Sequence, residues 1–279
     1  MSLEIKEYVG KGLSLFKTLN RAEFYAEITS ARDALEAFSY AEKRGLKPFV
    51  LGGGSNVFFK NSNIKSFILK NALPKKIEPL GGDRFKVSSS VRMMELLKFA
   101  YSESRSACYY LASAPCEVGG AIAMNAGTGP RESKAVFDFL ESVEYVSDGS
   151  VVEKPAAEIR HSHRHTELSE NAFIVSAVFK LPKTNFDRDP IKARLDWARE
   201  NQDLSVPNCG SLCNKYNAGL MKLTRALFRP FPAGMSRKKL NWTYNKADNP
   251  IYLRAFLFTL KFLHKLFRKE LKFEIKIVS

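Results

Sequence analysis

The chain has 279 residues, 45% of them hydrophobic and 12% aromatic, which is enough for one large domain or two to three smaller ones with a sizeable core. Its first residues include no apolar run of the signal-peptide type, and basic residues interrupt its longest apolar stretch, 251–267, so we expect neither a secretory signal nor a transmembrane helix. The formal net charge is +15, and the segment from Lys215 onwards contains fifteen Lys and Arg but only three acidic residues. Such a basic segment suits an anionic partner, which could be nucleic acid, an acidic membrane surface or a phosphorylated small molecule.

Residues 27–46 have the spacing of an amphipathic helix. Apolar side chains recur at Ala31, Leu35 and Phe38, and Gly45 ends the pattern. Short apolar runs that predict strands follow at Pro48–Leu51, Val57–Phe59 and Phe67–Leu69.

The middle of the chain mixes strands with one clear helix, 91–104. The apolar runs that predict strands here are Phe85–Ser88, Ser142–Val146, Val151–Glu153 and Phe173–Leu181. The polar segment Pro182–Pro190 is bounded by prolines and predicts a boundary.

The last part of the chain is expected to hold helices at Ile191–Asn201, Ala218–Leu227 and Pro250–Lys269, and a final strand at Phe273–Val278. Helices and strands do not follow a strict βαβ rhythm, so we predict an α+β fold. We expect three lobes, residues 1–70, 71–185 and 186–279.

A first glycine cluster, Gly52, Gly53, Gly54, Ser55 and Asn56, separates two predicted strands. Consecutive glycines let the backbone turn sharply and leave no Cβ to keep a ligand away. Bare N–H groups can then form an anion-binding concavity that suits a pyrophosphate. A tight hairpin turn is the alternative, and the cluster fits neither the Walker nor the GxGxxG pattern.

A second cluster combines Gly119 and Gly120 with Asn125, Ala126 and Gly127. Most residues between its ends are small, so the backbone could pack against a flat or extended ligand. A close-packed start of a helix is the alternative.

Taken together, LGGGSN and the later VGGAIAMNAG resemble the FAD-binding lobes of the UDP-N-acetylenolpyruvoylglucosamine reductase family. The resemblance implies the two-subdomain flavin fold shared with vanillyl-alcohol oxidase and p-cresol methylhydroxylase, followed by a substrate domain. It implies that both glycine-rich loops wrap the FAD pyrophosphate, with lobes 1–70 and 71–185 holding FAD and lobe 186–279 closing over the substrate.

Three further segments resemble family motifs in the same order: Ile159–Ser162, Cys209–Lys215 and Phe273–Ile277. The resemblance places Arg160, Ser211 and Glu274 in the reaction centre. It also implies that NADPH reduces FAD, and that the flavin then passes hydride to one carbon of a UDP-sugar enol ether.

The family roles fit the chemistry of these side chains. The guanidinium of Arg160 can stabilise an enolate-like anion through charge-assisted hydrogen bonds. Ser211 would give the proton to the adjacent carbon, for which a serine needs a favourable electrostatic field. Glu274 would be the second polar group beside the enolate.

Several positions depart from the family pattern. Ser113 and Cys116 stand where the second loop usually has glycines, and residues 17–23 replace an Arg-x-Gly-Gly-Pro loop. Residues 239–242 stand where the family has Lys-His-Ala-Asn-Phe. Two alternatives therefore stay open: a diverged paralogue that reduces another unsaturated sugar nucleotide, and a non-catalytic basic binding protein on the same fold.

Metal binding is not expected. The four cysteines, Cys108, Cys116, Cys209 and Cys213, have no zinc-site spacing, and without a signal peptide we expect reduced thiols in the cytoplasm. His161, His163 and His165 would share one face of a strand, which is compatible with a metal patch, but a solvated polar strand is favoured because no acidic or cysteine ligand is near in sequence.

The helix near residues 251–269 has apolar residues around much of its girth, with Lys and Arg on one side. It could lie on an anionic membrane, but packing on a sheet before the closing strand is favoured. We expect a monomer with small-molecule partners, a UDP-sugar and NADPH, without nucleic acid and without membrane insertion.

Overall fold

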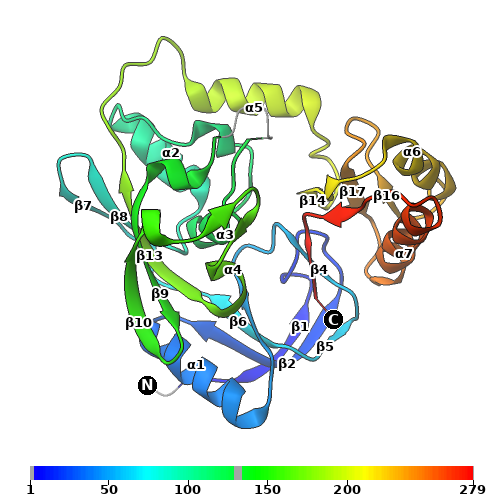
Figure 1. Cartoon of the computed structure of the whole chain (residues 1–279), viewed down its shortest axis with the longest axis horizontal. Helices are drawn as coiled ribbons and strands as arrows, with labels where there is room; N and C mark the ends of the chain where they lie inside the picture. The colour runs from blue at the N-terminus through cyan, green and yellow to red at the C-terminus, as the bar shows by residue number, and fades with distance from the viewer. Residues whose placement is uncertain (1–2, 129–133, 279) are drawn as a thin grey trace. The chain divides into compact units, whose positions relative to one another are not determined.

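The computed structural model describes residues 3–128 and 134–278 (Figure 1). Contacts divide the chain into two compact units. Unit 1 comprises residues 1–6, 25–52 and 67–198, and unit 2 comprises residues 7–24, 53–66 and 199–279. The division into three lobes remains a prediction. Unit 2 includes residues 53–66 because a strand there pairs with the end of the chain.

A small parallel sheet opens unit 1. The second half of β2 (Asn20–Ile28) pairs with β6 (Phe67–Asn71), which pairs in turn with β3 (Pro48–Leu51). Helix α1 (Ala31–Arg44) connects β2 to β3 and begins at Ser30, whose side chain accepts a hydrogen bond from the backbone of Asp33. It ends at Gly45, which has a φ of 62°, a left-handed conformation that glycine adopts without steric cost. The helix predicted for residues 27–46 is confirmed.

An antiparallel sheet forms the rest of the framework of unit 1, with the strand order β10-β9-β13-β8-β7. Its strands are β7 (Ile77–Gly81), β8 (Arg84–Ser88), β9 (Leu140–Ser147), β10 (Ser150–Pro155) and β13 (Phe173–Lys180). Alternate residues of β8 are buried, whereas β13, in the middle of the sheet, is buried along most of its length.

Helices contribute to the same core in unit 1. They are α2 (Met93–Ser102), α3 (Val118–Ala123), α4 (Leu168–Asn171) and α5 (Pro190–Asn201), with short 3-10 turns at Tyr109–Leu111, Val136–Phe139 and Ala156–Glu158. Val87, Leu97, Ile122 and Phe179 meet in this core. A two-stranded hairpin, β11 (His161–Ser162) and β12 (His165–Thr166), completes the unit.

Unit 2 is built from short strands and two helices. Its strands are β1 (Lys6–Gly10), the first half of β2, β4 (Val57–Phe59), β5 (Asn63–Ile64), β14 (Asn208–Ser211), β15 (Cys213–Lys215), β16 (Ala233–Met235), β17 (Trp242–Asn245), β18 (Lys272–Phe273) and β19 (Lys276–Val278). They form a three-stranded sheet β14-β17-β16 and the pairs β15-β18 and β19-β4.

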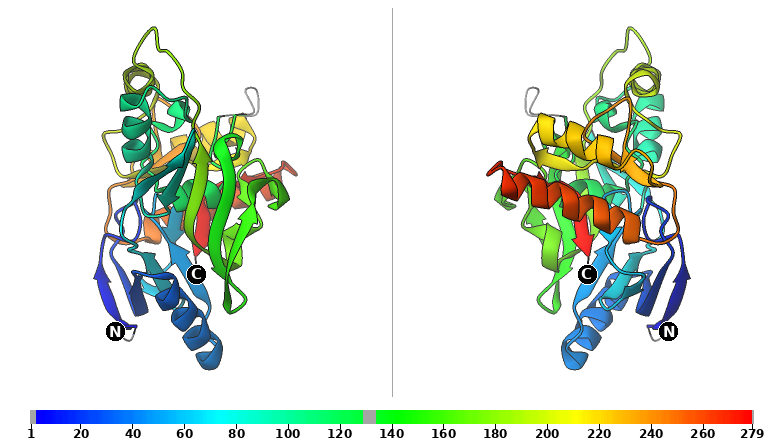
Figure 2. Two further views of the ribbon diagram at one scale, coloured as in Figure 1. Left: turned by 90° about the vertical axis from the view of Figure 1, so that its left-hand side faces the viewer. Right: turned by 90° about the vertical axis from the view of Figure 1, so that its right-hand side faces the viewer.

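Helices α6 (Ala218–Leu227) and α7 (Ile251–Leu266) lie beside each other in unit 2 (Figure 2). Phe58, Leu212, Met221 and Phe256 belong to the core of this unit. The helix predicted at residues 218–227 is confirmed with the same bounds, and Asn217 caps it by accepting a hydrogen bond from the backbone of Leu220.

The single closing strand predicted at residues 273–278 is wrong in one respect, because it is divided into β18 and β19 at Glu274. The backbone N–H of Glu274 donates to the carbonyl of Leu212, and its carbonyl accepts from the side chain of Asn56. The chain therefore changes partner at this residue, from β15 to β4. Within residues 3–128 and 134–278, no helix is long and apolar enough to cross a bilayer.

Candidate functional site

The second glycine cluster begins in α3, where Gly119 and Gly120 provide no side chains. A Cβ at Gly119 would lie 2.8 Å from the Cβ of Ser89, so this glycine is needed for close packing. A Cβ at Gly120 would meet no described atom within 4 Å, and Gly120 is exposed. Internal packing therefore explains why residue 119 is a glycine but not why residue 120 is one, and the exposed Gly120 could contact a ligand.

The turn after α3 has a strained backbone and an unpartnered buried oxygen. Asn125 has a φ of 40°, in the region that side chains seldom adopt. Its Nδ2 donates to the carbonyl of Ser162 over 3.1 Å, whereas its buried Oδ1 has no hydrogen-bond partner among the described residues. Gly127 then contacts the chain so closely that a Cβ would lie 2.1 Å from the carbonyl oxygen of Lys134.

The hairpin β11-β12 holds this turn in place. Arg164 donates to the carbonyl of Gly127 over 2.8 Å, and the hydroxyl of Thr166 donates to the carbonyl of Ala123. His161 stacks on Phe137 with 4.2 Å between ring centroids. In the described part of the chain, no three His, Cys, Asp or Glu side chains are grouped as metal ligands. The histidine-rich segment therefore supports the glycine cluster.

A partly buried charge pair lies beside Gly52 in unit 1. Lys70 donates to the carbonyl of Gly52 over 2.6 Å and lies 3.6 Å from Oε1 of Glu117. The other carboxylate oxygen, Oε2, has no hydrogen-bond partner among the described residues and would lie 3.0 Å from a Cβ at Gly52. Burial raises the pKa of Glu117, and Lys70 opposes that rise. Neither residue was predicted as a site residue from the sequence.

The rest of the first glycine cluster, Gly53 to Asn56, lies in unit 2. Gly54 has a φ of 66°, and a Cβ there would lie 2.4 Å from the carbonyl oxygen of Leu13. The backbone of Leu15 donates to the carbonyl of Gly54. The hairpin interpretation is wrong, because β3 pairs with β6 and β4 pairs with β19.

Unit 2 brings two of the three predicted catalytic residues into neighbouring segments. Ser211 ends β14 opposite Trp242, and the backbone N–H of Glu274 donates to the carbonyl of the next residue, Leu212, over 2.8 Å. Burial, with a smaller contribution from Glu274, raises the pKa of the Cys213 thiol to about 12.

Arg160 lies in unit 1, and its side chain is 89% exposed. Its Nε donates to Glu167 over 2.8 Å, and Lys154 donates to the same carboxylate. These two hydrogen bonds lower the pKa of Glu167 to about 2. Grouping of Arg160 with Ser211 and Glu274 stays a prediction.

Asn241 fixes the strand that follows Ser211 and was not predicted as a site residue. Its Oδ1 accepts from the backbone of Cys213 over 2.9 Å, and its Nδ2 donates to the carbonyl of the same residue over 2.7 Å. Its backbone carbonyl accepts from Leu212. The available signal was its place in residues 239–242, which stand where the family has Lys-His-Ala-Asn-Phe and keep the Asn.

Replacement Asn241→Ala should therefore lower the free energy of unfolding by about 1–3 kcal/mol, because both side-chain hydrogen bonds to Cys213 are lost and their partners stay part-buried. Urea unfolding followed by tryptophan fluorescence would measure the change. Asn241→Asp keeps the acceptor and loses the donor, so we expect an intermediate value. If Asn241→Ala changed the free energy of unfolding by less than about 0.5 kcal/mol, the two hydrogen bonds to Cys213 would not stabilise the fold as proposed.

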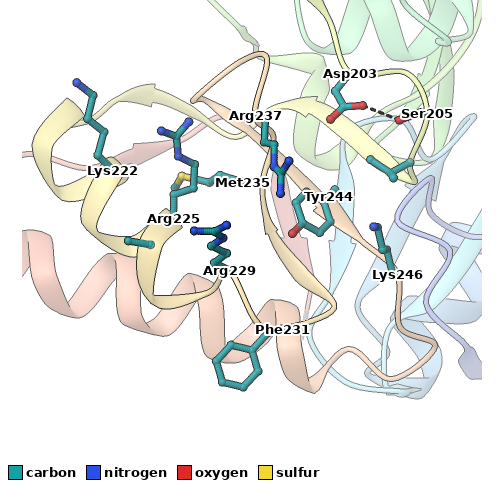
Figure 3. Close-up of a pocket in the computed structure, with 12 residues that line it drawn as sticks. Asp203, Ser205, Lys222, Arg225, Arg229, Phe231, Met235, Arg237, Tyr244 and Lys246 are labelled. Atoms are coloured by element: carbon teal, nitrogen blue, oxygen red, sulfur yellow. Dashed lines mark hydrogen bonds between the residues drawn. The ribbon is translucent and has the colours of Figure 1, made fainter.

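A basic pocket of about 870 Å³ lies wholly within unit 2 (Figure 3). Five cationic side chains line it: Lys222, Arg225, Arg229, Arg237 and Lys246. None of the five forms an ion pair with a carboxylate among the described residues. This volume is in the range of small-molecule sites, and unpaired guanidinium groups favour an anionic ligand.

Met235 and Tyr244 also line the pocket, and Figure 3 shows Arg237 beside the tyrosine ring. Asp203 also lines the pocket. Burial alone would raise the pKa of Asp203. Hydrogen bonds from Ser205 and Ser236 have the larger combined effect, so the pKa lies below the usual value for an aspartate.

Comparisons with known proteins support the resemblance predicted from the sequence. Residues 22–154 match the FAD binding domain family. The UDP-N-acetylenolpyruvoylglucosamine reductase of Aquifex aeolicus is 27% identical over 251 residues, which cover 87% of this chain and 84% of that protein. The reductase of the same name from Listeria monocytogenes serotype 4a is 27% identical over 276 residues, which cover 94% and 91%.

The fold also has a close structural counterpart. The crystal structure of UDP-N-acetylenolpyruvylglucosamine reductase from Thermus caldophilus aligns with a TM-score of 0.76 and 20% identity, covering 99% of this chain and 100% of that one. The predicted α+β class with an FAD-binding region is confirmed. The predicted resemblance is confirmed as well: over most of its length the chain is similar to UDP-N-acetylenolpyruvoylglucosamine reductases.

Proposed function

We propose that the chain uses FAD and NADPH to reduce UDP-N-acetylglucosamine enolpyruvate to UDP-N-acetylmuramate, a peptidoglycan precursor, in the cytoplasm. The observation that carries this proposal is that Ser211 and Glu274 lie in neighbouring segments of unit 2, joined by the hydrogen bond from the backbone of Glu274 to Leu212. Asn56 of the first glycine cluster donates to the carbonyl of Glu274. Similarity to reductases of this name over most of the chain supports the same activity.

The residues present fit FAD. Gly120 presents a bare, exposed backbone that internal packing does not need, and Oδ1 of Asn125 is a buried acceptor without a protein donor among the described residues. A ligand with hydroxyl and N–H donors can satisfy such an atom. The residues that would hold FAD are Gly52, Gly53, Gly54, Ser55, Asn56, Gly119, Gly120, Asn125, Ala126 and Gly127.

The altered loop at Ser113 and Cys116 is compatible with this assignment. Neither residue has a positive φ in the structure, so a side chain at these positions causes no backbone strain. Ser113 accepts a hydrogen bond from Arg194, and the carbonyl of Cys116 accepts from the backbone of Met93. The two side chains are therefore accommodated where the family has glycines.

When bound, FAD would supply the two electrons of the reduction as a hydride. Reduction of the enol ether adds that hydride to one carbon and a proton to its neighbour. We assign the proton to the hydroxyl of Ser211, and the stabilisation of the enolate-like anion to Arg160, with Glu274 as a further hydrogen-bonding group. A hydroxyl that gives up its proton needs a positive field, and a guanidinium supplies one.

The basic pocket of unit 2 would hold the diphosphate of the UDP-sugar. Its guanidinium groups match the geometry and charge of phosphate oxygens. Tyr244, which is partly exposed in the pocket, offers an aromatic face for the uracil ring. Lys222 lines this pocket, whereas Lys215 pairs with Glu270 over 3.0 Å.

Joint replacement of Arg225 and Arg237 by Gln should raise KM for the enolpyruvate at least about tenfold with little change in kcat, because charge-assisted bonds to the diphosphate contribute equally before and during the reaction. Steady-state kinetics with varied enolpyruvate would measure both constants. Lys60→Gln removes an exposed charge elsewhere in unit 2 and should leave KM unchanged. An unchanged KM in the double variant would place the diphosphate elsewhere.

Product analysis tests the activity itself. The chain incubated with FAD, NADPH and UDP-N-acetylglucosamine enolpyruvate should yield a product heavier by two hydrogen atoms, identified by mass spectrometry. FAD reduction by NADPH without this product would favour a paralogue that acts on another unsaturated sugar nucleotide.

A further inference from the structure

Helix α7 has an apolar stripe on its outward side in addition to the one that packs into the core. Its buried residues are Leu253, Phe256, Leu257, Leu260 and His264. Because successive residues of a helix are rotated by about 100°, Ile251, Phe258, Phe262 and Leu266 lie together on the opposite side. All four are exposed, Phe258 by 71%, Leu266 by 60% and Phe262 by 52%.

The exposed side chains of α7 form a continuous surface. The rings of Phe258 and Phe262 stack with 6.4 Å between centroids and 12° between planes. Phe267, directly after the helix, is also exposed. A row of large side chains without packing partners costs solubility, and contiguous exposed apolar patches mark interaction sites. Single exposed apolar residues would carry no such meaning.

Basic residues border this stripe on one side. Arg254, Lys261 and Lys265 are exposed and follow one edge of the helix, and Arg268 and Lys269 continue the charge beyond its end. Residues 251–269 contain no Asp or Glu. Figure 2 shows α7 along one side of unit 2 next to α6. The stripe and its cations together are called the α7 outer face below.

We propose that the α7 outer face docks on the surface of an anionic lipid bilayer, with the helix lying parallel to the membrane. Aromatic and aliphatic side chains of such a helix enter the boundary between headgroups and acyl chains. The long stems of Lys and Arg reach the lipid phosphates from the same depth. No described helix is suited to cross the bilayer, so binding is peripheral.

A second copy of the chain fits this face poorly. In a two-fold symmetric dimer the same patch meets itself, so Arg254, Lys261 and Lys265 would face their own copies without an acidic residue of α7 to neutralise them. Anionic headgroups neutralise these charges. The proposal is independent of the reductase activity, because the α7 outer face shares no residue with the basic pocket or the glycine clusters.

Vesicle flotation of the full chain tests the proposal. The chain should float with phosphatidylcholine vesicles that contain about one third phosphatidylglycerol, and not with phosphatidylcholine alone. Joint replacement Phe258→Ser and Phe262→Ser should lower the bound fraction at least about tenfold, since it removes most of the inserted apolar area. Joint replacement Lys261→Gln and Lys265→Gln should weaken binding and reduce its dependence on salt.

Leu204→Ser is the matched control, because Leu204 is an exposed apolar residue of unit 2 outside the α7 outer face; it should float like the unchanged chain. The serine variants should keep the unchanged thermal unfolding midpoint and reductase activity. Absence of flotation with anionic vesicles would overturn the proposal, as would equal flotation of the double serine variant. The proposal would also be overturned if the chain bound no vesicles but formed a dimer that the serine replacements dissociate. That result would assign the α7 outer face to contact with a second copy of the chain.

Discussion

Ser211→Ala is expected to lower reduction of the enolpyruvate by about 10²–10⁴, the range that a positioned proton donor contributes. Reduction of FAD by NADPH should stay within about twofold of the unchanged rate, because the hydride step to the flavin needs no proton from Ser211. The hydroxyl lies at the end of β14, one residue before the carbonyl that binds the backbone of Glu274. Anaerobic stopped-flow absorbance would record the two half-reactions separately.

The variant is informative because its fold can be checked. Ser211 is only partly buried, and its side chain makes no hydrogen bond with another described residue, so its removal should change the thermal midpoint little. Ser62→Ala, at an exposed serine of the same unit, should leave both half-reactions unchanged. Loss of both half-reactions in a folded, FAD-bound Ser211→Ala chain would exclude a role confined to proton donation.

Gly120→Ala is expected to weaken FAD binding at least about tenfold, equivalent to about 1.4 kcal/mol, without loss of stability. An added Cβ meets no described atom within 4 Å, and alanine within α3 should even stabilise the free protein by about 0.5–1 kcal/mol. A decrease in affinity can then only arise from contact with the ligand. Fluorescence titration with FAD and thermal unfolding without FAD measure the two effects.

Gly127→Ala is the contrasting variant in the same cluster. Its Cβ would lie 2.1 Å from the carbonyl oxygen of Lys134, so the backbone must shift, and the free energy of unfolding should fall by about 1–3 kcal/mol. An unchanged FAD affinity in Gly120→Ala would show that the bare side of α3 does not contact the cofactor.

Local patterns predicted the helices well. Residues 218–227 were predicted as a helix and form α6 with the same bounds, because a capping Asn and a helical apolar spacing act over neighbouring residues. The two glycine clusters carried the resemblance to the reductases for a similar reason: close backbone contacts dictate their residue types, since a Cβ at Gly54 or Gly127 would collide with a neighbouring carbonyl oxygen.

Contacts between distant segments could not be predicted. The hairpin suggested for Gly52–Asn56 was wrong because its flanking strands pair with β6 and β19, which belong to different sheets. The division of the closing strand at Glu274 depends on Leu212 and Asn56 in the same way. The spacing of residues along the sequence does not indicate which distant segments will pair.

The partly buried charge pair of Glu117 and Lys70 was missed for a related reason. Glu117 and Lys70 are 47 positions apart in the chain, and only the fold brings them within 3.6 Å beside Gly52. The ambiguity of the α7 region had a different origin. Its apolar residues cover two opposite sides of the helix, so the pattern was compatible with core packing and with a membrane surface, and the structure shows that one stripe is buried while the other is exposed.

The most direct test of the proposed function is a visible absorption spectrum of the purified chain with FAD, recorded before and after NADPH and then UDP-N-acetylglucosamine enolpyruvate in the same anaerobic cuvette. We expect a protein-bound flavin spectrum that NADPH bleaches and the enolpyruvate restores. A chain that binds no flavin, even with FAD in excess, would contradict it.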